Sequence, residues 1–307
     1  MSLFALVTSE AFPGADWADR DTPLLAARLA GLGHRTRTVS WDGPAAVDWA
    51  AFDVVVLQSP WSMWRRLPAF ARWLDGVRAA GPRLANPYDV IRRGMSKDYL
   101  LALAPAVPVV PTVRTSGGRL PPGALDELAA TRREIGGEDP PTFVVKPVAS
   151  GGALDARRLR APAEVERHVA DLAAAGSDAC VQPYIATIDT LGEIGAVVIG
   201  GEFSHAIVKD AILRSGTARG FHPNPRPATE LSPADREQIM AAYRAYAATV
   251  DEPPASVRLD FLRAPADGHL LLLEIESVAP VRFFPLFPAA TEAYALLLSS
   301  YAEPRRT

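Results

Sequence analysis

The residues best suited to chemistry lie in one stretch of the chain, residues 256–280. Four charged side chains stand there in two pairs, each pair spaced two residues apart: Arg258 with Asp260, and Glu274 with Glu276. Side chains two apart on a strand share a face, so three carboxylates and a guanidinium are expected on one surface. Hard cations such as Mg²⁺ prefer carboxylate oxygens and leave room for phosphate oxygens, which predicts a metal site beside a nucleotide. The alternative is a solvated outer face carrying an Arg–Asp pair.

Two adjacent strands must position these charges. Residues 257–262 alternate in polarity, residues 264–268 have the composition of a turn, and residues 269–275 form an apolar run. Two such runs joined by a short turn predict a β-hairpin. Its strands would bring the two charged pairs face to face.

The composition is that of a globular chain of 307 residues, 49% hydrophobic and 22% charged, long enough for two or three substructures. The net charge of −3 gives no indication of a nucleic-acid or membrane partner. A single cysteine, Cys180, excludes an internal disulfide and a cysteine-based zinc site. No signal-peptide pattern and no run of membrane-spanning length is present, so we expect a soluble cytoplasmic protein, compatible with a homodimer or homotetramer.

The first third of the chain alternates strand and helix patterns. The expected strands are residues 2–7, 36–41, 52–57 and 84–85, and the expected helices are residues 24–32 and 67–79. This alternation predicts a small, doubly wound parallel α/β domain, which binds ligands at the carboxyl ends of its strands.

One such strand end leads into the segment 58–66, Q-S-P-W-S-M-W-R-R. A substrate-facing loop is one reading, with Trp61 and Trp64 beside the substrate and Arg65 or Arg66 available to a carboxylate. A loop whose tryptophans cap the core is the other. The segment alone does not decide between the two.

Lys97 is expected in the first turn of a helix that runs to Leu103, with Ser96 as its N-cap. A lysine at that position opposes the helix dipole, which is tolerable if the amine faces an anion. A solvated lysine is the alternative. Residues 107–113 follow as an expected edge strand, because they include two prolines.

A second lysine, Lys146, ends the expected strand 142–146, and the chain then enters Ser150-Gly151-Gly152. Missing side chains let backbone N–H groups approach an anion closely. The P-loop spacing is absent, so such a loop would cover phosphates from above. A plain Gly-Gly turn between strands is the alternative.

The remaining chain continues this mixed pattern. A strand at 179–185 ends at an expected hinge, a hairpin of residues 191–198 and 202–209 ends on Lys209, and residues 210–226 read as a mobile loop. Further helices are expected at residues 124–133, 163–174, 233–250 and 289–301. Two arginines are candidates for a substrate carboxylate: Arg214, in the loop after Lys209, and Arg282, just beyond the metal strand.

This order of parts resembles the ATP-grasp superfamily over almost the whole chain. Within the superfamily it is most similar to the branch that contains the D-cycloserine cyclo-ligase, an enzyme of antibiotic biosynthesis. The segments that carry this closer similarity are residues 48–57, 86–91, 107–112, 203–209 and 272–276. The resemblance implies a glutathione-synthetase-like α+β fold: an N-terminal domain (1–110), a lid subdomain (111–184) and a catalytic, metal-binding subdomain (185–307) that clamp ATP.

The resemblance also implies a role for each matching residue. Those expected to hold the nucleotide are Lys97, Lys146, Ser150, Gly151, Gly152, Gln182, Pro183, Tyr184, Ile185, Glu193 and Lys209. Those expected to act in catalysis are Arg258, Lys209 and Lys146, and the Mg²⁺ ligands are Asp260, Glu274 and Glu276. Two departures stand out. Glu276 occupies a position that is commonly Asn, and residues 58–63 read Q-S-P-W-S-M where the branch usually has R-S-T-W-D-Y, so the substrate is not carried over.

The expected reaction is an ATP-dependent ligation of a small-molecule carboxylate to an amine. ATP would phosphorylate the carboxylate, and attack of the amine on the acyl phosphate would form an amide or a ring on an amino-acid-like substrate of specialised metabolism. One alternative is a phosphotransferase that stops at the phosphorylated product. Another is a nucleotide-binding regulatory protein without turnover.

Overall fold

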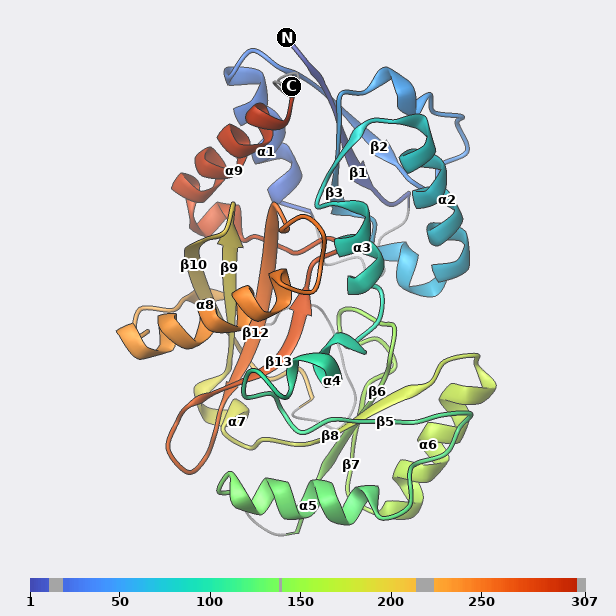
Figure 1. Ribbon diagram of the computed structural model, residues 1–307, viewed down its shortest axis with the longest axis vertical. Helices are drawn as coiled ribbons and strands as arrows, with labels where there is room; N and C mark the ends of the chain where they lie inside the picture. Colours follow the sequence, from blue (N-terminus) through green and yellow to red (C-terminus); the bar gives the residue numbers. More distant parts are fainter. Residues whose placement is uncertain (11–18, 138–139, 214–223, 303–307) are drawn as a thin grey trace.

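Three sheets lie one below the other in the computed structural model, which describes residues 1–10, 19–137, 140–213 and 224–302 (Figure 1). The first sheet is parallel, with the order β2-β1-β3-β4. Its strands are β1 (Leu3–Thr8), β2 (Arg35–Ser40), β3 (Val54–Ser59) and β4 (Arg83–Ala85). All six residues of β3 are buried, because helices cover both faces of the sheet. The predicted doubly wound parallel α/β domain is confirmed.

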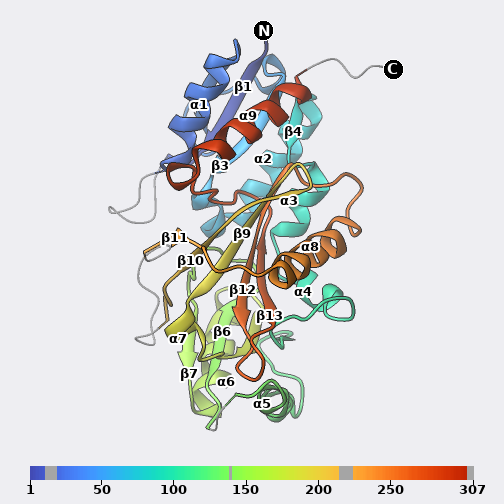
Figure 2. The same ribbon diagram turned by 90° about the vertical axis from the view of Figure 1, so that its left-hand side faces the viewer.

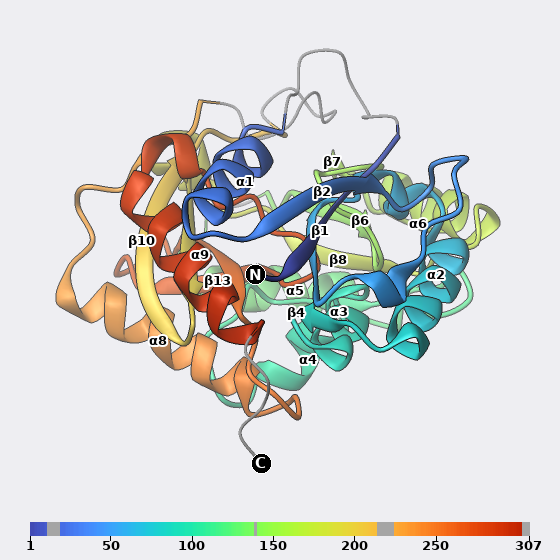
Figure 3. The ribbon, with the colours of Figure 1, turned by 90° about the horizontal axis from the view of Figure 1, so that it is seen from above.

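The helices on the first sheet come from both ends of the chain. Helix α2 (Leu67–Ala80) covers one face, and α1 (Asp21–Gly31) covers the other together with the closing helix α9 (Pro288–Tyr301). Figures 2 and 3 show α9 running beside α1. One hydrophobic core joins this layer to the second sheet through β1, β9 and α9. The three domain boundaries drawn from the sequence stay a prediction.

The second sheet is antiparallel and has the order β11-β10-β9-β12-β13. Its strands are β9 (Glu193–Ile199), β10 (Glu202–Lys209), β11 (Arg226–Pro227), β12 (Ser256–Arg263) and β13 (Leu270–Glu276), and α8 (Pro233–Ala247) packs on it. Both predicted hairpins are confirmed. The β12–β13 register pairs Arg258 with Glu276 and Asp260 with Glu274.

The third sheet has the order β5-β8-β6-β7 and packs against two helices. Its strands are β5 (Val113–Arg114), β6 (Phe143–Pro147), β7 (Arg157–Leu159) and β8 (Ala179–Pro183), and its helices are α5 (Ala124–Glu134) and α6 (Pro162–Ala174). The short helix α7 (Ile188–Leu191) leads back to the second sheet. Among the helices that the structure describes, none is long and apolar enough to cross a membrane.

The connections between sheets differ from the sequence prediction in two places. Lys97 lies in the turn between α3 (Tyr88–Gly94) and α4 (Tyr99–Leu103), so it precedes the helix, and Ser96 is not its N-cap. Of the edge strand predicted for 107–113, only Val113 lies in a strand, β5. Pro108 and Pro111 have no N–H group to donate to a strand pairing. Three 3₁₀ turns complete the elements: η1 (Trp49–Ala51), η2 (Trp61–Arg65) and η3 (Phe284–Leu286).

Candidate active site

A cavity of about 840 Å³ opens between the second and third sheets. Strands β6, β8, β9, β10, β12 and β13 all contribute to its lining. Twelve of the residues predicted from the sequence line it: Lys146, Gly152, Gln182, Pro183, Tyr184, Ile185, Glu193, Lys209, Arg258, Asp260, Glu274 and Glu276. Elements far apart in the chain therefore bring the predicted nucleotide, metal and catalytic residues together.

All three lysines of the chain lie at this site, whereas its 29 arginines are distributed widely. The Lys97 and Lys146 ammonium groups approach the two Glu274 oxygens at 3.2 and 3.7 Å. Lys209 closes β10 and contacts Glu193 and Asp260. Each lysine is at most 7% exposed. Burial lowers the pKa of Lys146, and the neighbouring Glu274 opposes that shift.

Arg258 occupies the centre of the carboxylate cluster. Its Nε and Nη2 atoms donate to the two Asp260 oxygens at 2.8 and 2.9 Å, and Nη2 also lies 3.0 Å from Glu276. Burial disfavours the guanidinium charge, but Asp260 and Glu276 hold the pKa of Arg258 above its usual range. The shared face predicted for these residues is confirmed by the strand register.

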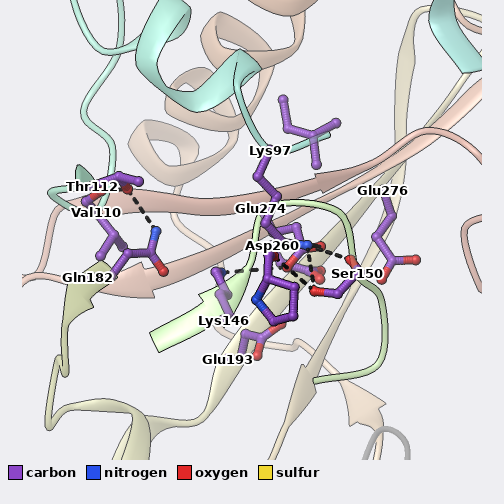
Figure 4. Close-up of polar contacts among 12 residues, drawn as sticks. Lys97, Val110, Thr112, Lys146, Ser150, Gln182, Glu193, Asp260, Glu274 and Glu276 are labelled. Atoms are coloured by element: carbon purple, nitrogen blue, oxygen red, sulfur yellow. Dashed lines mark hydrogen bonds and ion pairs between the residues drawn. The ribbon is translucent and has the colours of Figure 1, made fainter. Parts of the chain in front are cut away.

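Burial also acts on the acids. It raises the pKa of Glu193 to about 7, although the adjacent Lys209 pulls in the other direction. It raises the pKa of Glu276 as well, against the effect of Arg258. Four basic and four acidic side chains thus balance one another in the site. Figure 4 shows the four acids together with Lys97 and Lys146. A charged ligand would have to exchange partners with these internal ion pairs.

The predicted Mg²⁺ ligands fit a metal that is shared with phosphate. In the described part of the chain, no three His, Cys, Asp or Glu side chains are gathered closely enough to hold an ion by themselves. Asp260, Glu274 and Glu276 each face a basic group instead. Mg²⁺ at phosphate sites usually takes one or two carboxylates and completes its shell with phosphate oxygens and water. The oxygen donors suit that arrangement, and the three-ligand assignment stays a prediction.

Tyr99 is a site residue that the sequence reasoning missed. Its hydroxyl donates to the Ile275 carbonyl and accepts from the Ile275 N–H, both at 2.9 Å. β13 is the edge strand of its sheet, so this hydroxyl replaces a missing neighbouring strand. The contact fixes the backbone between Glu274 and Glu276. The aromatic residue two positions after Lys97 carries no sequence signal for that role.

The loop after β6 is held by Lys97. The Lys97 Nζ donates to the Ser150 carbonyl, and the Lys97 N–H donates to the Val148 carbonyl at 2.9 Å. The next residue, Gly151, presses against Trp64, because a Cβ added to it would come within 2.3 Å of the indole nitrogen. The predicted phosphate loop therefore spans from β6 to the first domain.

Apolar side chains beside the hinge complete the cavity. Val144, Leu262 and Leu273 line it together with Pro183 and Ile185. Such a slot accepts a flat, apolar ring, and the hinge backbone lies at its edge. Leu262 lies two residues after Asp260 on β12 and so is expected on the same face, but the sequence reasoning used this spacing only for the charged residues.

A second cavity of about 470 Å³ adjoins the first and shares Gly152, Glu274 and Glu276 with it. Trp61 and Trp64, from the η2 segment, line its far side. Arg65, on the same segment, is exposed and lines neither cavity. Arg214 lies outside the described residues.

Arg282 does not stand where a substrate ligand was predicted. It is 1% exposed, lines neither cavity, and donates to protein groups through all three guanidinium nitrogens. The acceptors are Ser256 Oγ, Gln58 Oε1, the Pro280 carbonyl and Tyr294 Oη. The sequence pattern showed an arginine after the metal strand but not that the chain turns it into the core.

Comparisons with known proteins place the chain in a family. A family model for the N-terminal domain of D-cycloserine synthetase DcsG matches residues 4–86. The cycloserine biosynthesis protein DcsG of Streptomyces lavendulae is 34% identical over 289 residues, which cover 91% of this chain and 92% of that protein. The crystal structure of D-cycloserine synthetase DcsG matches with a TM-score of 0.86 at 30% identity, covering 98% of this chain and 100% of that one.

More distant structures share the fold. The D-alanine–D-alanine ligase from Bacillus anthracis, solved in complex with ATP, has a TM-score of 0.68 at 12% identity and covers 98% of this chain and 97% of its own. The ATP-grasp ligase PsnB, solved with a precursor variant, Mg and ADP, has a TM-score of 0.59 at 20% identity and covers 98% of each chain. The chain belongs to the D-cycloserine synthetase (DcsG) family and has the fold of the ATP-grasp ligases.

Proposed function

We propose that this protein uses Mg²⁺ and ATP to join a carboxylate to an amine through an acyl phosphate, on an amino-acid-like substrate of antibiotic-type metabolism. One observation carries the proposal: Lys146, Lys209 and Arg258 converge with four carboxylates in a single cavity, and Lys97, the third lysine of the chain, contacts one of these carboxylates, Glu274. Lysine is a compact point charge suited to phosphate, and the surface of this chain uses arginine instead. The reaction needs ATP, which is supplied in the cytoplasm, so we expect the protein to act there.

Nucleotide binding would exchange the partners of the internal ion pairs. Lys97 and Lys146 leave Glu274 for the phosphates, which frees the Glu274 oxygens as ligands for Mg²⁺. Lys209 turns from Asp260 to the γ-phosphate in the same way. Bound Mg²⁺ supplies Lewis-acid neutralisation of the phosphate charge. Arg258, fixed by Asp260, donates to the oxyanion that forms when the amine attacks.

The chemistry is balanced in two steps. The substrate carboxylate attacks the γ-phosphorus, and the bond to the β-phosphate oxygen breaks, which releases ADP. The amine then attacks the acyl carbon, the bond from carbon to the phosphate oxygen breaks, and phosphate leaves with one proton lost from nitrogen. The second cavity, between Trp64 and Glu276, is where the acid and the amine would meet.

The name of the family relative supports this class of substrate. DcsG of S. lavendulae is a cycloserine biosynthesis protein, and the DcsG crystal structure is that of a D-cycloserine synthetase. Ring closure and intermolecular ligation are both forms of the proposed reaction. The N-terminal domain (1–110), the lid (111–184) and the catalytic subdomain (185–307) are proposed as the units that clamp ATP.

Product analysis against a panel of amino acids and their derivatives tests the proposal. The expected result is release of ADP and phosphate in equal amounts, dependent on an acid and an amine, stopped by EDTA and restored by Mg²⁺. ADP without phosphate would indicate a phosphotransferase. ATP binding without any ADP would indicate a regulatory nucleotide-binding protein.

A further inference from the structure

Gln182, the residue of β8 before the hinge proline, has a partner across the sheet. The register of β5 and β8 pairs Val113 with Val181, so the next pair along is Thr112 with Gln182. The Gln182 Nε2 donates to Thr112 Oγ1 at 2.8 Å. Figure 4 shows the two side chains facing each other at the edge of the site.

The Thr112 hydroxyl fixes which end of the Gln182 amide faces it. Thr112 Oγ1 lies 2.7 Å from the Val110 carbonyl, which can only accept, so the single hydroxyl proton is used there. The oxygen of the hydroxyl can then only accept a hydrogen bond from Gln182. The amide must turn its NH₂ group to Thr112, and its oxygen faces the cavity.

The Val110 carbonyl makes the alternative orientation costly. Within the described chain no donor other than the Thr112 hydroxyl reaches that carbonyl, and Val110 is 1% exposed. Val110 is itself held by its N–H, which donates to the Leu272 carbonyl of β13 at 2.9 Å. An amide flip would draw the proton away from Val110 and leave a buried acceptor unpaired.

Gln182 Oε1 is therefore a fixed acceptor at the edge of the apolar slot. Gln182 is 1% exposed and lines the cavity, and its oxygen has no hydrogen-bond partner among the described residues. The 6-position of adenine carries an amino donor, whereas that of guanine carries a carbonyl acceptor. A fixed acceptor attracts the first and repels the second.

We propose that Thr112 is a positioning residue which, by holding the Gln182 amide, makes the site select adenine over guanine nucleotides. This inference rests on the proposed function, which places a purine nucleotide in the cavity. A buried acceptor that bonds to the adenine amino group discriminates strongly, because a guanine nucleotide would leave that acceptor unpaired.

Calorimetric titration with Mg·ATP and Mg·GTP tests the inference without knowledge of the acid or the amine. Thr112→Val removes the hydroxyl at nearly constant shape, and Thr112→Ser keeps it. In the valine variant the ratio of the GTP Kd to the ATP Kd should fall by about tenfold or more, which is the equivalent of one buried hydrogen bond. The serine variant should keep the wild-type ratio. A purely structural role would weaken both nucleotides equally and leave the ratio unchanged.

A double-mutant cycle tests whether Thr112 acts through Gln182. Adding Thr112→Val to Gln182→Met should change the ratio no further, because the amide is already gone. Thr112→Ala tests the same hydroxyl if the valine variant does not fold. If these variants bind ATP and the ratio of the GTP Kd to the ATP Kd is unchanged, the inference about Thr112 is overturned and the proposed function stands. Failure of the wild type to bind ATP would overturn the proposed function and the inference with it.

Discussion

Glu274 is the side chain on which the proposed partner exchange depends, because it lines the first cavity and contacts both Lys97 and Lys146. Its two oxygens lie 3.2 Å from Lys97 and 3.7 Å from Lys146. Lysine, unlike arginine, has no planar fork that holds a carboxylate in one geometry, so it exchanges one anion for another readily. The low lysine content of the chain was a sequence signal for this site, and it needed no structure to be read.

Changing Glu274 to Gln should abolish ATP turnover while leaving the fold intact. The substitution preserves shape but removes the charge that Mg²⁺ needs and that two buried lysines share, so the free energy of unfolding should fall by about 1–3 kcal/mol while the protein stays folded. ADP release and urea denaturation measure the two effects. Glu202→Gln, an exposed acid at the start of β10 in the same sheet, is the matched control and should keep full turnover. Normal turnover of Glu274→Gln at saturating Mg²⁺ would remove Glu274 from the metal site.

At the level of elements, buried hydrogen bonds join the segment after β13, residues 282–284, to α1 of the first domain. Asp21, at the start of α1, accepts hydrogen bonds from the backbone N–H groups of residues 282, 283 and 284. Burial raises the pKa of Asp21, and the hydrogen bonds from this segment oppose the shift. The Arg282 side chain reaches β3, β12 and α9 from the same turn.

Arg282→Met should therefore lower stability and not substrate affinity. It leaves four buried acceptors without a donor, which should cost about 3 kcal/mol or more in the free energy of unfolding. Urea denaturation measures this cost, and ATP affinity should stay at the wild-type value. Arg226→Met, which removes an exposed pair with Asp210, is the control and should change stability by about 0.5 kcal/mol or less. Unchanged stability with a raised KM for the acid would restore Arg282 as a substrate ligand.

His205 links β10 to the same segment and should make stability depend on pH. Its Nε2–H donates to the Arg282 carbonyl at 2.8 Å, and its Nδ1 lies 2.9 Å from Ser204 Oγ, so the neutral ring is fully bonded. Burial lowers the pKa of His205 from 6.5 to about 4. The unfolded chain then binds more protons than the folded protein between these pH values. The stability from this site is complete above pH 6.5 and is lost as the pH falls toward 4.

The measurement is urea denaturation at pH 7.5 and pH 5.0. Wild type should lose about 2 kcal/mol more than His205→Asn over this interval, because only the histidine takes up a proton on unfolding. Equal losses in both proteins would show that His205 is not held neutral in the folded state.

Most elements followed from periodicity, and the exceptions have physical causes. The β12–β13 hairpin could be predicted down to its charged face, because alternation fixes which side chains share a surface. The turn at Lys97 was predicted as helix because serine is a common N-cap residue. In the structure the Ser96 hydroxyl bonds to Asp98, and Asp98 is itself the N-cap of α4. Tyr99, Thr112 and Arg282 act through partners far along the chain. A single sequence holds no information about such pairings.

At the scale of the whole molecule, the site is a junction of all three layers. Lys97 comes from the connection after the first sheet, Lys146 from the third sheet, and Lys209 with the carboxylates from the second. Trp64 of the first layer rests on the Gly151 loop that leaves the third. A ligand that binds the three lysines must therefore contact three parts of the chain at once.

Carbon NMR of protein labelled only at the lysine ε-carbon tests this account most directly. The chain has three lysines, so the spectrum should hold three signals, which Lys→Arg variants assign. Saturating Mg·ATP should shift all three, and AMP, which lacks the β- and γ-phosphates, should leave them nearly unmoved. If calorimetry shows ATP bound while the three signals stay in place, or if AMP moves them as far as ATP does, the lysines do not form the phosphate site.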